Sequence, residues 1–328
     1  NGLQKRDESF IFKTGDEKMK SLNLFLYFIC FIFLLSCSKP QKNITIASGG
    51  TGGVYFPLAG GIANIFSKNI EGYRGNAEVT GGSVDNIKLL SQNKVEIGFS
   101  IIDTAYDAYM GRGVFDSKID LRILAILYLN RVHLVTDKNS GIEKFTDLEN
   151  KKVSVGSPGS GTEVTSLRII NSFGLTDKYN KQRLSVVESV NALKDKKIDA
   201  FFWLGGLPTS AITDLSSSFG SSIKIINTTE NIDELNDQFG NLYRNDIIPA
   251  STYKGLEGDI QTISLWNVLL VRSDMDEDFA YKITETIFKN LPDLELVHSE
   301  AKNFNIANQI SENSPIPFHP GALNYFNN

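Results

Sequence analysis

Two loops rich in glycine and serine carry the residues of this chain that are best suited to hold a negatively charged group. The first contains Gly49-Gly50-Thr51-Gly52-Gly53, and the second contains Gly156-Ser157-Pro158-Gly159-Ser160-Gly161-Thr162. Each loop follows a short β-prone run and precedes a helical pattern of apolar residues. A strand that passes into a helix through such a loop leaves backbone N–H groups unpaired at the positive end of the helix dipole. Two such loops predict two lobes that share one anion.

Further polar residues lie where predicted strands and helices meet. Ser83, in the stretch Gly81-Gly82-Ser83, and Asn86 suit either a helix start or ligand contact, and Trp203 suits either the core or a pocket wall. Asp103 suits a solvated helix face, or a site near the predicted cleft where it would receive a ligand ammonium group. The candidate ligand-binding residues are Thr51, Gly52, Gly53, Tyr55, Ser83, Asn86, Asp103, Ser157, Gly159, Ser160, Gly161, Thr162 and Trp203.

Several enzyme classes lack their motifs in this sequence. Neither glycine-rich loop continues into Gly-Lys-Ser/Thr or shows the three-glycine dinucleotide spacing, and no Gly-x-Ser-x-Gly elbow occurs. His133, His298 and His319 are too far apart in sequence to suggest a metal site, so we predict no metal, cofactor or catalytic residue. A net charge of -5 without a basic run argues against a nucleic-acid partner.

The sequence contains an internal repeat. Residues 44–53 align without a gap with residues 153–162, and residues 87–99 align in the same way with residues 190–202. Chance similarity between α/β segments would explain one such match, but two matches in the same order favour a duplicated unit.

The alternation of strands with helices predicts parallel sheets wound by helices. Ligands of such sheets bind outside the carboxyl ends of the strands. We therefore expect four loops to gather there, at residues 48–53, 81–83, 156–162 and 203–209. Ile102–Met110 is predicted as a helix that Gly111 ends.

The length of 328 residues, of which 41% are hydrophobic, suits two domains. The β-prone runs at residues 132–135 and 263–272 would cross between the domains and form a hinge. The predicted fold class is therefore α/β with two similar lobes, each a mainly parallel sheet wound by helices. Lobe I is predicted to span residues 43–136 and 265–328, and lobe II residues 137–264.

The N-terminal region predicts a secretory signal. Residues 22–35 are almost wholly apolar, follow the basic Lys20 and end at Leu34-Leu35-Ser36-Cys37, which resembles the bacterial lipoprotein box. We expect a signal peptide over 19–36, acylation of Cys37, a tether over 37–42 and a non-native or disordered extension over 1–18. A short membrane anchor with an incidental cysteine is the alternative. The protein is thus predicted to be a periplasmic or cell-surface lipoprotein.

Together, these motifs resemble the TAXI-type solute-binding proteins of TRAP transporters. The matching stretches are GGTGGVYFP at 49–57, GSVDNI at 82–87, GSPGSGTE at 156–163 and HPGA at 319–322. The resemblance implies a type II periplasmic-binding-protein fold and delivery of solute to an ion-driven TRAP permease, with its small and large subunits fused. It also implies a small carboxylate or amino-acid ligand, such as glutamate, glutamine or 2-oxoglutarate.

Two other functions are compatible with the same cleft. One is a secreted serine-dependent hydrolase or transferase, with Ser83 or Ser160 as nucleophile. The other is a receptor module that signals the presence of its ligand to a membrane partner without transporting it.

Overall fold

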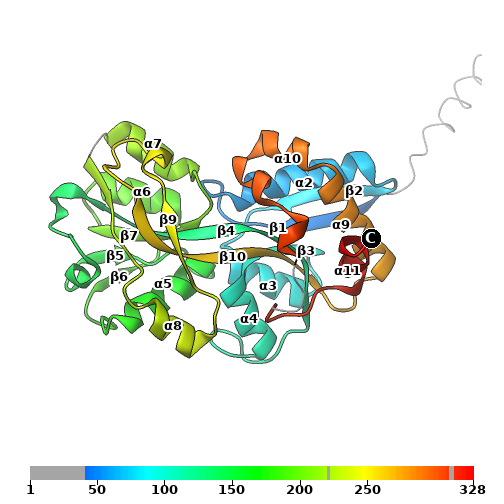
Figure 1. Ribbon diagram of the computed structural model, residues 1–328, viewed down its shortest axis with the longest axis horizontal. Helices are drawn as coiled ribbons and strands as arrows, with labels where there is room; N and C mark the ends of the chain where they lie inside the picture. The colour runs from blue at the N-terminus through cyan, green and yellow to red at the C-terminus, as the bar shows by residue number, and fades with distance from the viewer. Residues whose placement is uncertain (1–40, 220–221, 310–313) are drawn as a thin grey trace, which may run out of the picture. The chain divides into compact units, whose positions relative to one another are not determined.

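Two long antiparallel strands, β4 (Leu121–Asp137) and β10 (Ile260–Arg272), run side by side through the middle of the fold (Figure 1). This computed structural model describes residues 41–219, 222–309 and 314–328. Most residues of β4 are buried on both of its faces, as its nearly continuous apolar sequence requires. The apolar runs at 121–129 and 132–135 belong to one strand, because Arg131 keeps its place in the ladder opposite Ser264.

One half of the sheet lies beyond β10. It comprises β1 (Lys42–Ala47), β2 (Tyr73–Glu78) and β3 (Ile97–Ile101). Strand β1 pairs in parallel with both β2 and β3, and β3 pairs antiparallel with β10. The helices between these strands are α2 (Tyr55–Asn69), α3 (Ser83–Ser91) and α4 (Ile102–Met110). Gly111, with φ of 67°, ends α4 as predicted.

The other half lies beyond β4. It comprises β5 (Lys152–Ser154), β6 (Asn180–Gln182) and β7 (Ala200–Gly205), with β8 (Ile223–Ile225) paired to β4 and β9 (Arg244–Ile248) paired to β10. Strand β5 pairs in parallel with β6 and β7, and β7 pairs antiparallel with β4. Its helices are α5 (Gly161–Ser172), α6 (Val186–Lys194), α7 (Ser210–Phe219) and α8 (Ile232–Phe239).

The strand order β2-β1-β3-β10-β4-β7-β5-β6 shows the duplication that the sequence predicts. Counted outward from the two long strands, β3-β1-β2 on one side corresponds to β7-β5-β6 on the other. The repeated segments occupy equivalent places, since residues 44–53 and 153–162 each begin in the middle strand of their half. The predicted fold class, α/β with two similar halves, is confirmed.

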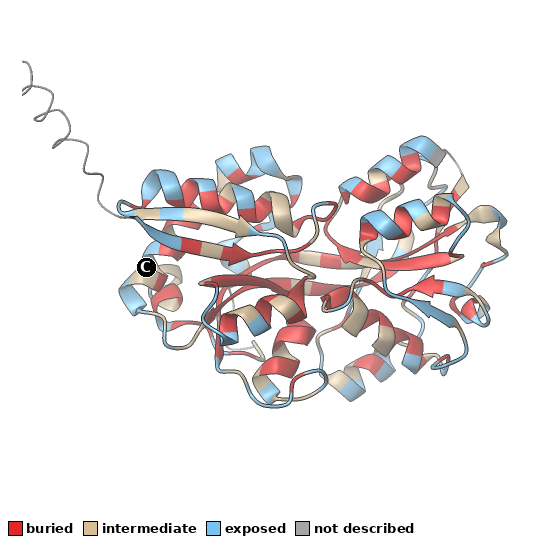
Figure 2. Cartoon of the chain, turned by 180° about the vertical axis from the view of Figure 1, so that it is seen from behind, coloured by how far each residue is buried: buried red, intermediate tan, exposed pale blue. Residues whose placement is uncertain are grey.

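The remaining helices complete the fold. They are α9 (Glu277–Lys289), α10 (Leu291–Val297) and α11 (Pro320–Phe326), with short 3-10 turns at Lys138–Ser140, Phe145–Leu148, Ala250–Thr252, Ser299–Asn303 and Ile306–Asn308. Figure 2 shows that buried residues follow the sheet and the inner sides of its helices, whereas the outer sides of the helices are exposed. Apolar burial between helices and sheet is the main force that holds such layers together.

Within the described ranges, no helix combines the length and the apolar character that crossing a bilayer requires. The predicted extension, the signal peptide with its apolar run, Cys37 and most of the tether lie outside these ranges. The lobe boundaries at 136/137 and 264/265 stay a prediction. Strand β10 pairs with both halves, since its register places Leu269 opposite Phe99 of β3 and Thr262 opposite Asp246 of β9, whereas β4 pairs with β10 and with β7 and β8 of the second half.

Candidate functional site

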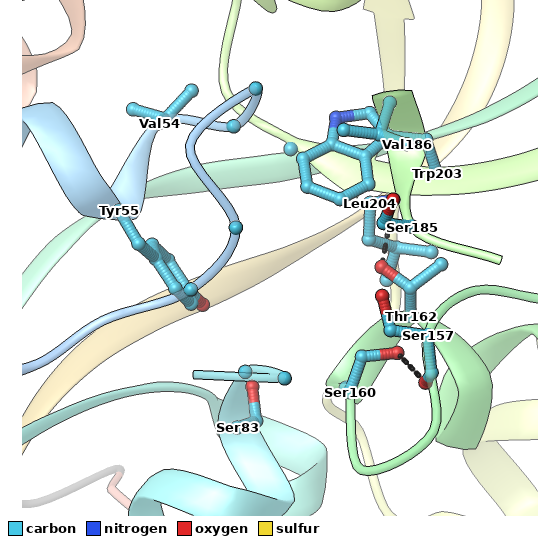
Figure 3. Close-up of a pocket in the computed structure, with 18 of the residues that line it drawn as sticks. Val54, Tyr55, Ser83, Ser157, Ser160, Thr162, Ser185, Val186, Trp203 and Leu204 are labelled. Atoms are coloured by element: carbon cyan, nitrogen blue, oxygen red, sulfur yellow. Dashed lines mark hydrogen bonds between the residues drawn. The ribbon is translucent and has the colours of Figure 1, made fainter. Parts of the chain in front are cut away.

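A cavity of about 250 Å³ lies between the two halves of the sheet. Most of the predicted ligand-binding residues line it, from both sides: Thr51, Gly52, Gly53, Tyr55, Ser83, Ser157, Ser160, Gly161, Thr162 and Trp203. Figure 3 shows Val54, Tyr55 and Ser83 on one side and Ser160, Thr162 and Trp203 on the other. Each of the four predicted loops contributes to the lining or lies next to it, at the carboxyl ends of β1, β2, β5 and β7.

The starts of α2 and α5 both face this cavity region. In the described part of the chain, the backbone N–H groups of Val54, Tyr55, Gly161 and Thr162 have no hydrogen-bond acceptor, and all four residues line the cavity. Ser160 caps α5, because its hydroxyl oxygen accepts a hydrogen bond from Glu163 N at 3.0 Å. Two helix starts from opposite halves thus offer unused donors to one space, which is the arrangement that suits an anion.

The start of α3 is used differently. Its N-cap is Gly82, and the Ser83 hydroxyl accepts a hydrogen bond from Ile101 N at 3.1 Å instead of capping the helix. The carbonyl oxygen of Gly159 accepts from Val84 N at 3.1 Å and from Asp85 N at 3.2 Å. Gly159 does not line the cavity. Its carbonyl oxygen accepts the hydrogen bonds of two N–H groups in the first turn of α3, so these groups are not available to a ligand.

Asn86 lies outside the lining as well. Its amide nitrogen donates to Ser48 O at 2.6 Å and to Phe99 O at 2.8 Å, and its amide oxygen accepts from Thr80 Oγ1 at 2.6 Å. The side chain is fully buried. Asn86 thus fixes the loop after β1 against β3 and has no group left for a ligand.

Asp103 is buried in a charged cluster outside the lining. Its carboxylate accepts from Thr165 Oγ1 at 2.9 Å and from Tyr243 OH at 3.1 Å, and pairs with Arg168 at 3.2 Å. Arg168 also pairs with Asp107, whose pKa burial raises. The cluster ties α4 of one half to α5 of the other and leaves Asp103 no place for a ligand ammonium group.

Apolar side chains form much of the cavity wall, namely Val54, Val79, Ile101, Val186, Val187 and Leu204. The indole nitrogen of Trp203 donates to Thr209 Oγ1 at 2.9 Å, which fixes the ring against the segment between β7 and α7. A Cβ atom on Gly53 would lie 2.9 Å from this ring, so glycine is needed for the close approach. Among the residues that the structure describes, no charged side chain lines the cavity.

The inner end of the cavity carries two polar residues that sequence reasoning missed, Tyr128 and Asn130 of β4. Nearby, the Tyr55 hydroxyl donates to Asn267 Oδ1, and its ring lies 4.9 Å from that of Phe99. Burial raises the pKa of both tyrosine hydroxyls well above their ordinary value, so they stay protonated and neutral. The signal in the sequence was a polar Asn130 within an otherwise apolar run.

Two further contacts join the halves beside the cavity. Gly52 O accepts from Ser210 Oγ at 3.0 Å, so the loop after β1 is bound to the start of α7. Glu300, which is 2% exposed, accepts from Leu207 N at 2.5 Å through its carboxylate. Burial raises the pKa of Glu300, since the carboxylate lies largely out of solvent.

The profile of the NMT1-like family matches residues 46–328, so this chain belongs to that family. Among solved structures, a protein from Bordetella bronchiseptica RB50 is 17% identical with a TM-score of 0.51, covering 81% of this chain and 76% of that one. XAC2383 from Xanthomonas citri, bound to ATP, is 10% identical with a TM-score of 0.50, covering 88% and 95%. The periplasmic aliphatic sulphonate binding protein SsuA from Escherichia coli is 14% identical with a TM-score of 0.49, covering 88% and 83%. At these identities the likeness concerns the fold alone.

Proposed function

We propose that this member of the NMT1-like family is an extracytoplasmic solute-binding protein that captures a small carboxylate between its two halves. The observation that carries the proposal is that two helix starts from opposite halves, at Tyr55 and Gly161, line one cavity with their N–H groups unused. Such donors hold a carboxylate without a cationic side chain. Because the ligand would contact both halves, its binding favours the conformation in which they lie together.

The chemistry of the lining favours binding over catalysis. The cavity-lining residues include no His, Lys, Asp or Glu that could act as a general base. The Ser160 hydroxyl donates to Ser157 O at 2.7 Å, so its proton is directed away from the cavity (Figure 3). A serine hydrolase would need such a base within reach of its nucleophile, so we favour the binding protein.

The finer parts of the proposal follow from the sequence motifs. We propose that the solute is a compound such as glutamate, glutamine or 2-oxoglutarate. The partner would be a TRAP permease with fused small and large subunits, and a lipid on Cys37 would hold the protein at the periplasmic or cell-surface face of a membrane. Uptake by proteoliposomes that contain permease and binding protein tests the partner, since a TRAP permease needs an ion gradient and an ABC importer needs ATP.

Thermal unfolding of the full chain, purified in detergent, tests the ligand class. A ligand that binds only the folded state at a hundred times its Kd stabilises that state by about 2.7 kcal/mol, so Tm rises. We expect a rise with at least one of the three carboxylates and none with an uncharged or cationic analogue of similar size. Absence of any rise would contradict the proposed ligand class.

A pair of glycine variants tests the location. A Cβ on Gly161 would lie 2.6 Å from Ser83 Oγ and 2.8 Å from Ile101 Cδ1, across the cavity, whereas a Cβ on Gly60 meets nothing within 4 Å. Gly161→Ala should reduce the ligand-induced rise in Tm, and Gly60→Ala should leave it unchanged. Equal behaviour of the two variants would place the ligand elsewhere.

A further inference from the structure

Two buried polar atoms at the inner end of the cavity have no hydrogen-bond partner within the described residues, the hydroxyl of Tyr128 and Oδ1 of Asn130. Tyr128 is fully buried, Asn130 is 1% exposed, and both line the cavity. They lie two residues apart on β4, and because both line one cavity they lie on the same side of that strand. A buried polar atom without a partner costs stability, so two such atoms in one cavity point to a ligand.

The hydrogen bonds around Asn267 fix which groups are left over. Its Nδ2 donates to the carbonyl oxygen of Tyr128 at 3.2 Å, so its Oδ1 faces the opposite way as an acceptor. That oxygen accepts from the Tyr55 hydroxyl and from Asn130 Nδ2, the latter at 2.7 Å. Asn130 Oδ1 therefore remains without a partner, and as an amide oxygen it can only accept a hydrogen bond.

The chemistry of these two atoms excludes several ligand groups. A carboxylate at this position has no proton to donate to Asn130 Oδ1, so this buried acceptor would stay unpaired. An ammonium group could donate, but the lining has no carboxylate to pair with it. A primary amide is neutral, donates through its N–H groups to Asn130 and accepts from the hydroxyl of Tyr128.

We propose that Tyr128 and Asn130 form a subsite for a carboxamide, so that the preferred solute is a small monocarboxylate with a primary amide at its other end. This inference rests on the proposed function, because the helix starts at Tyr55 and Gly161 would hold the carboxylate end. Asn267 acts as a positioning residue that keeps Asn130 Oδ1 turned toward the ligand.

Matched pairs of ligands test the subsite, because each pair differs only in an amide against a carboxylate. The probes are glutamine with glutamate, and succinamate with succinate, titrated by calorimetry into the full chain in detergent. One net hydrogen bond corresponds to roughly tenfold in affinity, so we expect the amide of each binding pair to bind at least about tenfold more tightly. A dicarboxylate that binds as tightly as its amide overturns the subsite and leaves the proposed function standing. If none of these four compounds binds and 2-oxoglutarate does not bind either, both the proposed ligand class and the subsite are overturned.

Two tyrosine variants separate ligand recognition from stability. Tyr128→Phe keeps the ring and removes only the unpartnered hydroxyl, so we expect an unchanged or higher Tm and a roughly tenfold loss of the amide preference. Tyr253→Phe is the control, because its hydroxyl contacts Thr209 N at 3.0 Å and His133 Nε2 at 3.1 Å outside the cavity. It should lower Tm and keep the affinity ratio. A Tyr128→Phe protein with the original ratio overturns the proposal.

Discussion

The carbonyl oxygen of Gly159 accepts a hydrogen bond from the backbone N–H group of Val84 across 3.1 Å. Gly159 belongs to the loop after β5 and Val84 to the first turn of α3, so the bond joins the two halves of the fold beside the cavity. The helix start at α3 thereby binds a protein carbonyl, while the starts of α2 and α5 keep unused donors. Contacts of this kind make ligand affinity depend on residues that never touch the ligand.

Replacing Gly159 with alanine should weaken both stability and binding. Its φ is +77°, where a side chain costs about 1–2 kcal/mol, and a Cβ would also lie 2.3 Å from Asp85 Oδ1. Gly174→Ala is the control, since Gly174 has φ of +63° and open space around it. Urea unfolding should show a loss for both variants, with the larger loss in Gly159→Ala. Only that variant should also lose ligand affinity, and equal effects would disprove the role of the crossing contact.

A second glycine pair tests the contact with Trp203. A Cβ on Gly53 would lie 2.9 Å from the indole ring, whereas a Cβ on Gly258, outside the cavity lining, meets nothing within 4 Å. Overpacking typically costs about 1–3 kcal/mol, which corresponds to roughly tenfold or more in affinity. We expect Gly53→Ala to weaken ligand binding by about that factor and Gly258→Ala to have no effect. Titration monitored by tryptophan fluorescence measures the ligand affinity of both variants. Unchanged affinity in Gly53→Ala would show that the close approach of Gly53 to Trp203 does not affect binding.

The buried pair of Asp103 and Arg168 should be important for stability. The Asp103 side chain is fully buried and that of Arg168 is 10% exposed. Asp103→Asn removes the negative charge that pairs with Arg168 and weakens the buried hydrogen bonds from Thr165 and Tyr243, while Asp107 still pairs with Arg168. We therefore expect it to cost about 1–3 kcal/mol in the free energy of unfolding. Lys289→Met, which breaks an exposed pair with Glu285, should leave that free energy unchanged within error. A small loss in Asp103→Asn would show that the cluster is solvated.

His133 should make stability depend on pH. Burial lowers its pKa from 6.5 to about 4, while its ring nitrogens lie 2.9 Å from Arg131 O and 3.1 Å from Tyr253 OH. Between these pH values the unfolded chain binds a proton that the folded chain does not, so stability falls as pH drops from about 6.5 toward 4. The full effect is roughly 3 kcal/mol. In urea unfolding at several pH values, His133→Gln should flatten this dependence, and an unaltered slope would assign it to other groups.

Much of the architecture could be predicted because its signals are local. The repeated strand-loop-helix segments at 44–53 and 153–162 do occupy equivalent strands, and Gly111 does end α4. The rule that ligands bind beyond the carboxyl ends of parallel strands brought the loops around Thr51 and Ser160 to one cavity.

The two polar residues at the inner end of the cavity could not be predicted in the same way. Tyr128 and Asn130 lie in a buried strand, and their role depends on Asn267, which is far away in sequence and meets them only through the pairing of β4 with β10. Asn86 and Asp103 show the converse, since their residue types suited a ligand but long-range partners in the fold use their polar atoms. Residue type and spacing show that a group can bind, whereas tertiary contacts decide what it binds.

The placement of Tyr128 and Asn130 on β4 has a mechanical consequence. Strands β4 and β10 form a ribbon that belongs to both halves, so any opening motion must twist this ribbon. A solute bound to Tyr128 and Asn130 would contact β4 directly and would restrict its twisting. Release of the solute would then be coupled to twisting of β4 and β10. A membrane partner that binds either half and twists it relative to the other would thereby promote release.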